Sequence, residues 1–210
     1  MKILFVLLFA TWFASAQDCP KGFRKFSPQI LKGDFDGDGK PDEIKTHLYS
    51  ELDKNEPECV ADAHEMEFDS VADWYSKKAT QLYLSLNEKE NLTLNFGYAD
   101  MLYCLINLGN IDKQGGDEIA LSIAYFDFSN VNSCRIYSFC SGQWVLRKQF
   151  SIHEDSFTYA SDDPAPTFAE IRGFLEKRNG IWRFSDYHES DLTLDVPYEK
   201  MSALKLKRCR

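Results

Sequence analysis

The chain has 210 residues, of which 33 are acidic and 24 basic, giving a formal net charge of −9 at pH 7. A nucleic-acid partner requires a basic face, so this balance argues against one. Residues 17–210 are enough for one domain with a sizeable core. No proline-rich, glycine-rich or charged stretch divides them cleanly, which predicts a single domain.

The N-terminus has the pattern of a secretory signal. Lys2 precedes an apolar stretch at residues 3–13 that is too short to span a bilayer. Ala14-Ser15-Ala16 then has the small-residue pattern that signal peptidase cleaves. We expect residues 1–16 to be removed and residues 17–210 to be exported, as a periplasmic or secreted protein. No second apolar stretch follows, so we predict no membrane span.

The next feature is an acidic run from Gly33 to Asp42. Carboxylates at alternate positions around a glycine turn are the ligand pattern that calcium loops use. We therefore predict a Ca²⁺ site, with Lys40 contributing its carbonyl. The predicted ligands are Asp34, Asp36, Asp38, Lys40 and Asp42. The alternative is an acidic surface turn, because Asp-Gly pairs are also common in hairpins.

This loop is not an EF-hand, which needs a bidentate Glu at the twelfth position. Counting from Asp34, that position is Lys45. Beyond the loop, Ile44, Thr46 and Leu48 alternate with polar residues, a period of two that indicates a strand. The acidic run is therefore expected to join two strands.

Further along, one short helix and several hairpins are expected. The helix covers residues 70–79, with Ser70 as a possible cap. Alternating strands at residues 82–86 and 92–96 flank a turn at residues 88–91. Residues 53–57 and 162–166 have the composition of loops.

A weaker copy of the acidic run begins at Gly109. Gly109-Asn110-Ile111-Asp112 resembles the start of the first run, and Asp117-Glu118-Ile119 resembles its end. Aligned on the Asp-Glu-Ile string, the second loop is one residue shorter. It is either a weak cation site or a turn that has lost its ligands. Repeats of this length suggest stacked or radially arranged β units.

Two more hairpins are predicted at Ser141-Gly142 and Asn179-Gly180, since such pairs between apolar runs favour tight turns. Each turn is followed by a tryptophan, Trp144 and Trp182, which we interpret as packing anchors.

An even number of cysteines in an exported chain predicts three disulfides. The six are Cys19, Cys59, Cys104, Cys134, Cys140 and Cys209. Cys134 and Cys140 fall on one predicted strand and are too far apart to pair with each other. A Cys19–Cys209 bond that ties the termini together is one attractive pairing among those left.

No nucleophile elbow, phosphate-binding loop or zinc-protease motif occurs in the sequence. The one polar cluster of interest near a predicted strand end is Asp186, His188 and Glu189, beside Tyr187. A solvated loop is the simpler interpretation of that cluster.

The acidic run resembles the calcium loop of FG-GAP (VCBS-type) repeats, best known from the integrin α-subunit β-propeller. The resemblance rests on Asp34-Phe-Asp36-Gly-Asp38-Gly-Lys-Pro-Asp42 and the strand that follows, with residues 109–119 as a degenerate second copy. It implies calcium held by these acids and the Lys40 carbonyl in a hairpin between propeller strands. A full propeller needs at least four blades. The implied fold is therefore mainly β, a meander of antiparallel hairpins forming a partial or divergent propeller with at most a short helix.

The sequence thus favours an exported, calcium-stabilised β module with a structural or interaction role and no enzymatic activity. Such a module would present loops or a sheet face to a protein or glycan partner. The alternative is an exported hydrolase acting on glycan or peptide, with the calcium loop as a structural appendage.

Overall fold

The computed structural model describes residues 19–113, 115–127, 129–157, 168–187, 200–207 and 209. The expected signal segment, residues 1–16, lies outside the described residues. So do the loop expected at residues 162–166, and His188 and Glu189 of the polar cluster.

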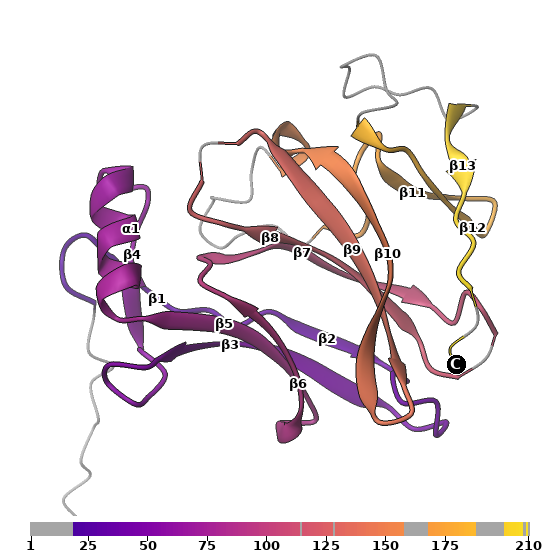
Figure 1. Ribbon diagram of the computed structural model, residues 1–210, viewed down its shortest axis with the longest axis horizontal. Helices are drawn as coiled ribbons and strands as arrows, with labels where there is room; N and C mark the ends of the chain where they lie inside the picture. The colour runs from indigo at the N-terminus through magenta and orange to yellow at the C-terminus, as the bar shows by residue number, and fades with distance from the viewer. Residues whose placement is uncertain are drawn as a thin grey trace, which may run out of the picture.

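The fold is mainly β with antiparallel pairing and one short α-helix, which confirms the predicted class (Figure 1). The helices are α1 (Phe68–Lys77) and the 3₁₀ turn η1 (Glu154–Phe157). The strands are β1 (Phe23–Lys25), β2 (Ile30–Gly33), β3 (Asp42–Ser50), β4 (Cys59–Ala61), β5 (Thr80–Leu86), β6 (Lys89–Gly97), β7 (Met101–Gly109), β8 (Glu118–Ala124), β9 (Val131–Cys140), β10 (Gln143–His153), β11 (Leu175–Arg178), β12 (Ile181–Phe184) and β13 (Ser202–Ala203).

Two four-stranded sheets have the same internal order. The first runs β2-β3-β5-β6 and the second β7-β8-β9-β10, all antiparallel. Each begins with a hairpin whose connection is one of the two acidic runs. A third sheet, β11-β12-β13, and a two-stranded pair, β1-β4, complete the described strands. The sequence repeat therefore corresponds to a structural repeat.

The second four-stranded sheet lies in the middle of the stack and has a hydrophobic core on each face. Ile119 and Leu121 of β8 belong to a core shared with Ile44 of the first sheet. Ala120, between them, belongs to a second core shared with Trp182 of the third sheet. Alternate side chains of a strand point to opposite faces, so β8 serves both cores. Within the described residues, three sheets packed in this way do not make the ring of at least four blades that a propeller requires.

Two predicted boundaries are wrong by a few residues. Helix α1 begins at Phe68, and its N-cap is Glu67, which makes no side-chain capping bond. Ser70 therefore lies inside the first turn, where its N–H donates to the Glu67 carbonyl. The turn between β5 and β6 is formed by Asn87 and Glu88, with φ of 52° and 53°. Strand β6 already begins at Lys89, within residues 88–91, where the sequence predicted the turn.

The two later hairpins and their tryptophans are confirmed. Ser141 and Asn179 have positive φ and precede the turn glycines. Trp182 is buried and its indole N–H donates to the Leu108 carbonyl at 2.8 Å. Trp144 packs edge-on against Phe139. Both rings pack against the protein, as expected for anchors.

The prediction of three disulfides is wrong, and so is the Cys19–Cys209 pairing. The bonds are Cys19–Cys59 and Cys140–Cys209, while Cys104 and Cys134 are buried thiols. Cys104 lies on β7 and Cys134 on β9, and β8 runs between these two strands. Two disulfides are compatible with a secreted protein. None of the described helices is long and apolar enough to cross a membrane.

Candidate metal centre

The first acidic loop, residues 34–41, connects β2 to β3, and Gly33 pairs with Asp42 at its base. Asp34, Asp36 and Asp42 each offer one carboxylate oxygen to a group whose members all lie within 4.8 Å of one another. Three carboxylates at this separation repel one another unless positive charge lies among them. Hard cations such as Ca²⁺ take oxygen ligands of this kind.

Asp42 is the structural base of the loop. It is only 6% exposed, and its Oδ2 accepts the backbone N–H groups of Phe35 at 2.9 Å and Asp36 at 3.1 Å. Its Oδ1 accepts a hydrogen bond from the Asn87 side chain at 2.6 Å. The fully buried Phe35 ring anchors the same turn in the core. The Asp42 carboxylate is therefore held in place from both sides.

Asp34 has one carboxylate oxygen without a partner. Its Oδ2 accepts the Gly39 N–H at 3.1 Å, whereas its Oδ1 is buried and has no hydrogen-bond partner among the described residues. A buried oxygen without a donor costs free energy. Asp36 turns the loop by accepting the Asp38 N–H at 3.0 Å. A cation between these carboxylates would satisfy the unpartnered oxygen.

Asp38 and Lys40 lie apart from the three grouped acids. Their side chains form an exposed ion pair at 2.8 Å, and the hydrogen bond from Lys40 lowers the pKa of Asp38. The Asp38 carboxylate also accepts the Lys40 backbone N–H. Of the four predicted carboxylate ligands, the structure thus groups three and leaves Asp38 paired with Lys40.

The second acidic loop, residues 110–117, repeats this backbone geometry between β7 and β8. Gly109 pairs with Glu118, as Gly33 pairs with Asp42. The Ile111 N–H donates to Glu118 Oε2 at 2.6 Å, and in both loops this donor and acceptor are seven residues apart. The predicted alignment of Asp117 with Asp42, with a shorter second loop, is therefore wrong. Glu118 is the counterpart of Asp42.

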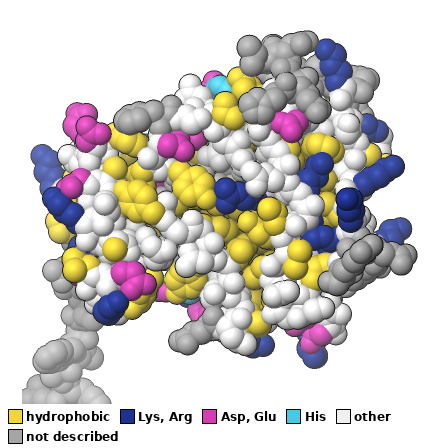
Figure 2. All heavy atoms as spheres, in the orientation of Figure 1, with side chains coloured by type: hydrophobic (Ala, Val, Ile, Leu, Met, Phe, Trp, Pro, Cys, Tyr) yellow, Lys and Arg dark blue, Asp and Glu magenta, His cyan; other side chains and the backbone are white. Residues whose placement is uncertain are grey.

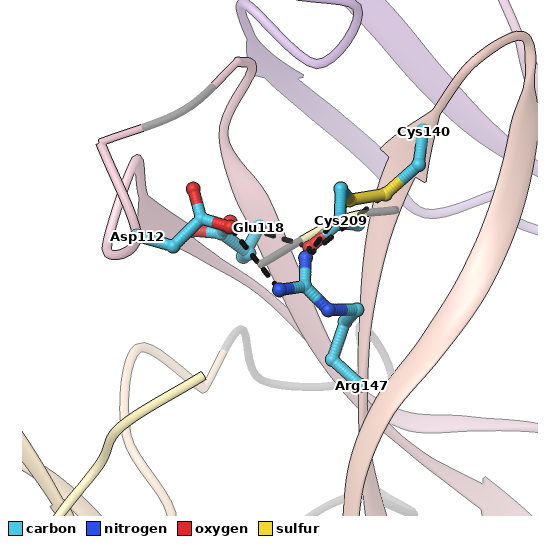
Figure 3. Close-up of a disulfide and its surroundings, with 6 residues drawn as sticks. Asp112, Glu118, Cys140, Arg147 and Cys209 are labelled. Atoms are coloured by element: carbon cyan, nitrogen blue, oxygen red, sulfur yellow. Dashed lines mark hydrogen bonds and ion pairs between the residues drawn. A yellow bond between two sulfur atoms is a disulfide. The ribbon is translucent and has the colours of Figure 1, made fainter. Parts of the chain in front are cut away.

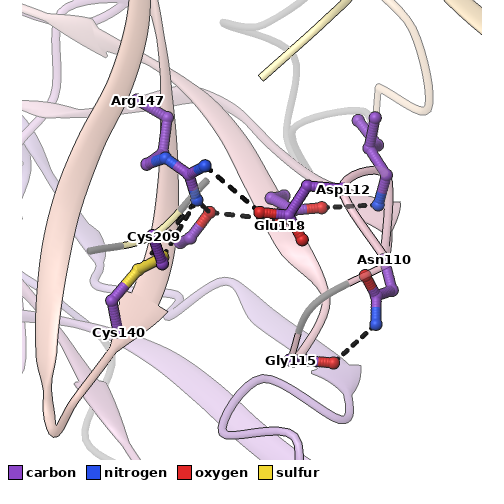
Figure 4. A network of polar contacts seen from close by, with 9 residues as sticks. Asn110, Asp112, Gly115, Glu118, Cys140, Arg147 and Cys209 are labelled. Carbon is purple, nitrogen blue, oxygen red and sulfur yellow. Dashed lines mark hydrogen bonds and ion pairs between the residues drawn. A yellow bond between two sulfur atoms is a disulfide. The ribbon is translucent and has the colours of Figure 1, made fainter. Parts of the chain in front are cut away.

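An arginine supplies the positive charge of the second loop. Arg147, on β10, forms an ion pair with Asp112 at 3.1 Å, and the two side chains are 4% and 6% exposed (Figure 3). The guanidinium also donates to Ser138 Oγ at 2.6 Å, and that hydroxyl donates to Glu118 (Figure 4). Burial raises the pKa of Glu118.

The same guanidinium donates to the sulfur of Cys209, in the disulfide with Cys140 (Figure 3). Sequence reasoning missed Arg147, because its partner Asp112 is 35 residues away and no local pattern marks the pair.

A serine–histidine–glutamate array lies on the first sheet. His47 Nε2 is 2.8 Å from Ser85 Oγ, and its Nδ1 is 2.7 Å from Glu56 Oε1. This order is the one that nucleophilic catalysis uses. Here, however, Ser85 is 3% exposed whereas the Glu56 side chain is 47% exposed, so the nucleophile is buried and the acid faces solvent. The Tyr83 hydroxyl also donates to Glu56, so the array fastens that loop onto the sheet.

Of the polar cluster near the end of β12, the described part is Asp186 and Tyr187. Asp186 Oδ1 accepts the backbone N–H of Ser151 at 3.2 Å, and the Tyr187 ring lies against His153 and Phe174. Comparison of the chain with protein-family models, curated proteins and solved structures finds no match. The chemistry of the first acidic loop is therefore inferred from its geometry.

Proposed function

We propose that the first acidic loop binds one calcium ion and that the protein is an exported calcium-binding β module related to the FG-GAP repeats. The observation that supports this most is that Asp34, Asp36 and Asp42 each place a carboxylate oxygen within 4.8 Å of the others. Asp34 also has a buried oxygen, Oδ1. Among the described residues, this oxygen has no hydrogen-bond donor, and no basic side chain bonds to the three carboxylates. A bound cation would supply both a positive charge and a partner for this oxygen.

Calcium is the proposed ion because all the available ligands are oxygens. Ca²⁺ accepts six to eight of them in an adaptable arrangement, whereas Mg²⁺ demands a near-ideal octahedron. Asp34, Asp36 and Asp42 provide the first ligands. In this proposal the Asp38 carboxylate leaves Lys40 to join them, and the Lys40 carbonyl and water complete the shell. The Asp38–Lys40 pair is exposed, so breaking it costs little.

The proposed role of the ion is structural. Binding would fix the β2–β3 connection and so contribute to the folding free energy of the first sheet. The module would then present a surface to a protein or glycan partner. In Figure 2, apolar side chains gather across the middle of one face, with charged side chains mostly around them. Exposed apolar patches of this kind favour an interaction surface.

The hydrolase alternative has less support. Its strongest observation is the array of Ser85, His47 and Glu56, in which the nucleophile is buried. An acyl-transfer enzyme needs that hydroxyl within reach of a substrate carbonyl. We therefore favour a non-enzymatic module.

The test is a thermal melt of the oxidised protein with chelator, with calcium and with magnesium. Calcium at about 100 times its Kd should stabilise the fold by about 2.7 kcal/mol. The Asp36→Asn variant should lose this increment, whereas Asp73→Asn, an exposed acid on α1, should keep it. No calcium effect on the native protein, or an equal effect of magnesium, would overturn the proposal.

A further inference from the structure

The two acidic loops are joined directly through the main chain of Asp34. The Asp117 N–H donates to the Asp34 carbonyl at 2.6 Å, and the Asp34 N–H donates back to Asp117 Oδ2 at 3.3 Å. One residue of the second loop thus holds both backbone groups of one candidate ligand. Asp117 itself lies outside the group of three carboxylates.

The orientation of the Asp117 carboxylate is fixed in turn. The Asn107 side chain donates to Asp117 Oδ2 at 2.9 Å and to the Lys32 carbonyl at 3.1 Å. Asn107 lies on β7 and Lys32 on β2, so this amide also joins the two edge strands from which the loops leave. The contact between the loops is therefore built on both hairpins.

Glycines allow this close approach. A Cβ at Gly116 would lie 2.1 Å from the Phe35 carbonyl oxygen, and a Cβ at Gly33 would lie 2.5 Å from Asn107 Nδ2. Distances below 3.0 Å cannot be tolerated without a shift of the neighbouring atoms. At Gly116 the obstructing atoms belong to the backbone, and they cannot move aside as the end of a flexible side chain could. At Gly116, the main chain of the second loop therefore packs directly against the main chain of the first.

A preformed site binds its ion more tightly, because the cost of ordering the ligands has already been met. In the first loop that cost includes bringing mutually repelling carboxylates together. We infer that the second loop is a cradle that preorganises the first, and that Asp117 is a positioning residue that sets its calcium affinity. This inference rests on the proposed calcium site.

The experiment is calorimetric titration of the oxidised protein with calcium, comparing Asp117→Ala with Asp117→Asn. Alanine removes both the charge and the acceptor for the Asp34 N–H, whereas asparagine removes the charge but keeps an acceptor oxygen. Loss of this hydrogen bond should weaken calcium binding about 10-fold in Asp117→Ala. Asp117→Asn should stay within about 3-fold of the native Kd, since screening limits the effect of a charge outside the site.

Two further variants separate positioning from other effects. Gly116→Ala changes no charge and should also weaken binding, because its Cβ displaces the Phe35 carbonyl. Asp73→Ala, on α1, is the control for loss of a surface acid and should leave the Kd unchanged. The melting temperature of each calcium-free variant is measured beside its calcium Kd. A purely structural role would lower the melting temperature and leave the Kd unchanged.

The outcomes are distinct. An unchanged Kd in Asp117→Ala, or equal weakening in Asp117→Ala and Asp117→Asn, overturns the positioning role while leaving the calcium site intact. Failure of the native protein to bind calcium overturns the proposed function and this inference with it. Should Asp117→Ala not fold, the other two variants decide. Native calcium affinity in both Asp117→Asn and Gly116→Ala contradicts the inference. Weaker calcium binding by Gly116→Ala, with near-native binding by Asp117→Asn, supports it.

Discussion

The two acidic loops have the same turn geometry and different charge compensation. In each, a backbone N–H near the start of the loop donates to the acid that opens the next strand, Asp42 in one and Glu118 in the other. Asp36 and Asp112 occupy equivalent positions. In the second loop, Arg147 pairs with Asp112. In the first, no described basic side chain bonds to the three grouped acids, whose nearest lysine pairs with Asp38 instead.

One hairpin connection can thus be stabilised in two ways. A guanidinium attached to β10 is a permanent counter-charge, buried beside the Cys140–Cys209 disulfide. An ion from solution would be exchangeable, so the first loop would respond to calcium concentration and the second would not. Where the first loop has Asp34, the second has Asn110. The second loop therefore has one carboxylate fewer at the equivalent positions and needs less positive charge.

The largest expected effect follows removal of the internal cation. Arg147→Met leaves Asp112 buried without its ion pair, and breaking a buried pair in this way costs about 3–5 kcal/mol. Urea unfolding of the oxidised protein measures the change. The double variant Arg147→Met/Asp112→Asn should recover part of it. A loss no larger than that of Arg178→Met, whose ion pairs are exposed, would contradict the role of Arg147.

A smaller effect is expected at the base of the first loop. Asp42→Ala removes the acceptor of two backbone N–H groups and of the Asn87 amide, which should cost roughly 2–4 kcal/mol in calcium-free buffer. Asp38→Ala, whose carboxylate is exposed, should leave calcium-free stability unchanged. Chemical denaturation of both variants with chelator present makes the comparison. Equal stabilities would show that Asp42 does not organise the loop.

The smallest effect concerns pH. Burial raises the pKa of Glu118, so the folded state keeps this proton to higher pH than the unfolded chain. The contribution of Glu118 is fully present below its unfolded pKa and is lost as pH rises through the folded pKa. Glu118→Gln should therefore gain stability relative to the native protein as pH rises above the pKa of an unfolded glutamate, about 4.3. Unfolding free energies that run parallel as pH rises above this value would contradict the prediction.

Local patterns predicted the loops and hairpins because their causes are local. The spacing of Asp34, Asp36 and Asp42 sets a turn of definite shape, and Asn179-Gly180 adopts the positive φ that a tight hairpin needs. The alignment of Asp117 with Asp42 is wrong because it follows the shared Asp-Glu-Ile string. The number of residues after the glycine fixes the pairing across the hairpin, and by that number Glu118 is the counterpart of Asp42.

What the sequence could not reveal depends on contacts between distant strands. Arg147 reaches Asp112 because β10 belongs to the same sheet as β7 and β8, the two strands that the Asp112 loop connects. Cys104 and Cys134 stay unpaired because β8 separates their strands. The order of strands in the sheet cannot be predicted from the spacing of the cysteines.

The calcium proposal is tested most directly by the number of calcium ions bound per chain, measured by calorimetric titration of the native protein and of two matched variants. Asp36→Asn and Asp112→Asn make the same change at equivalent positions of the two loops. We expect one ion in the native protein, none in Asp36→Asn and one in Asp112→Asn. Two ions in the native protein, or binding that survives Asp36→Asn and is lost in Asp112→Asn, would contradict the proposal.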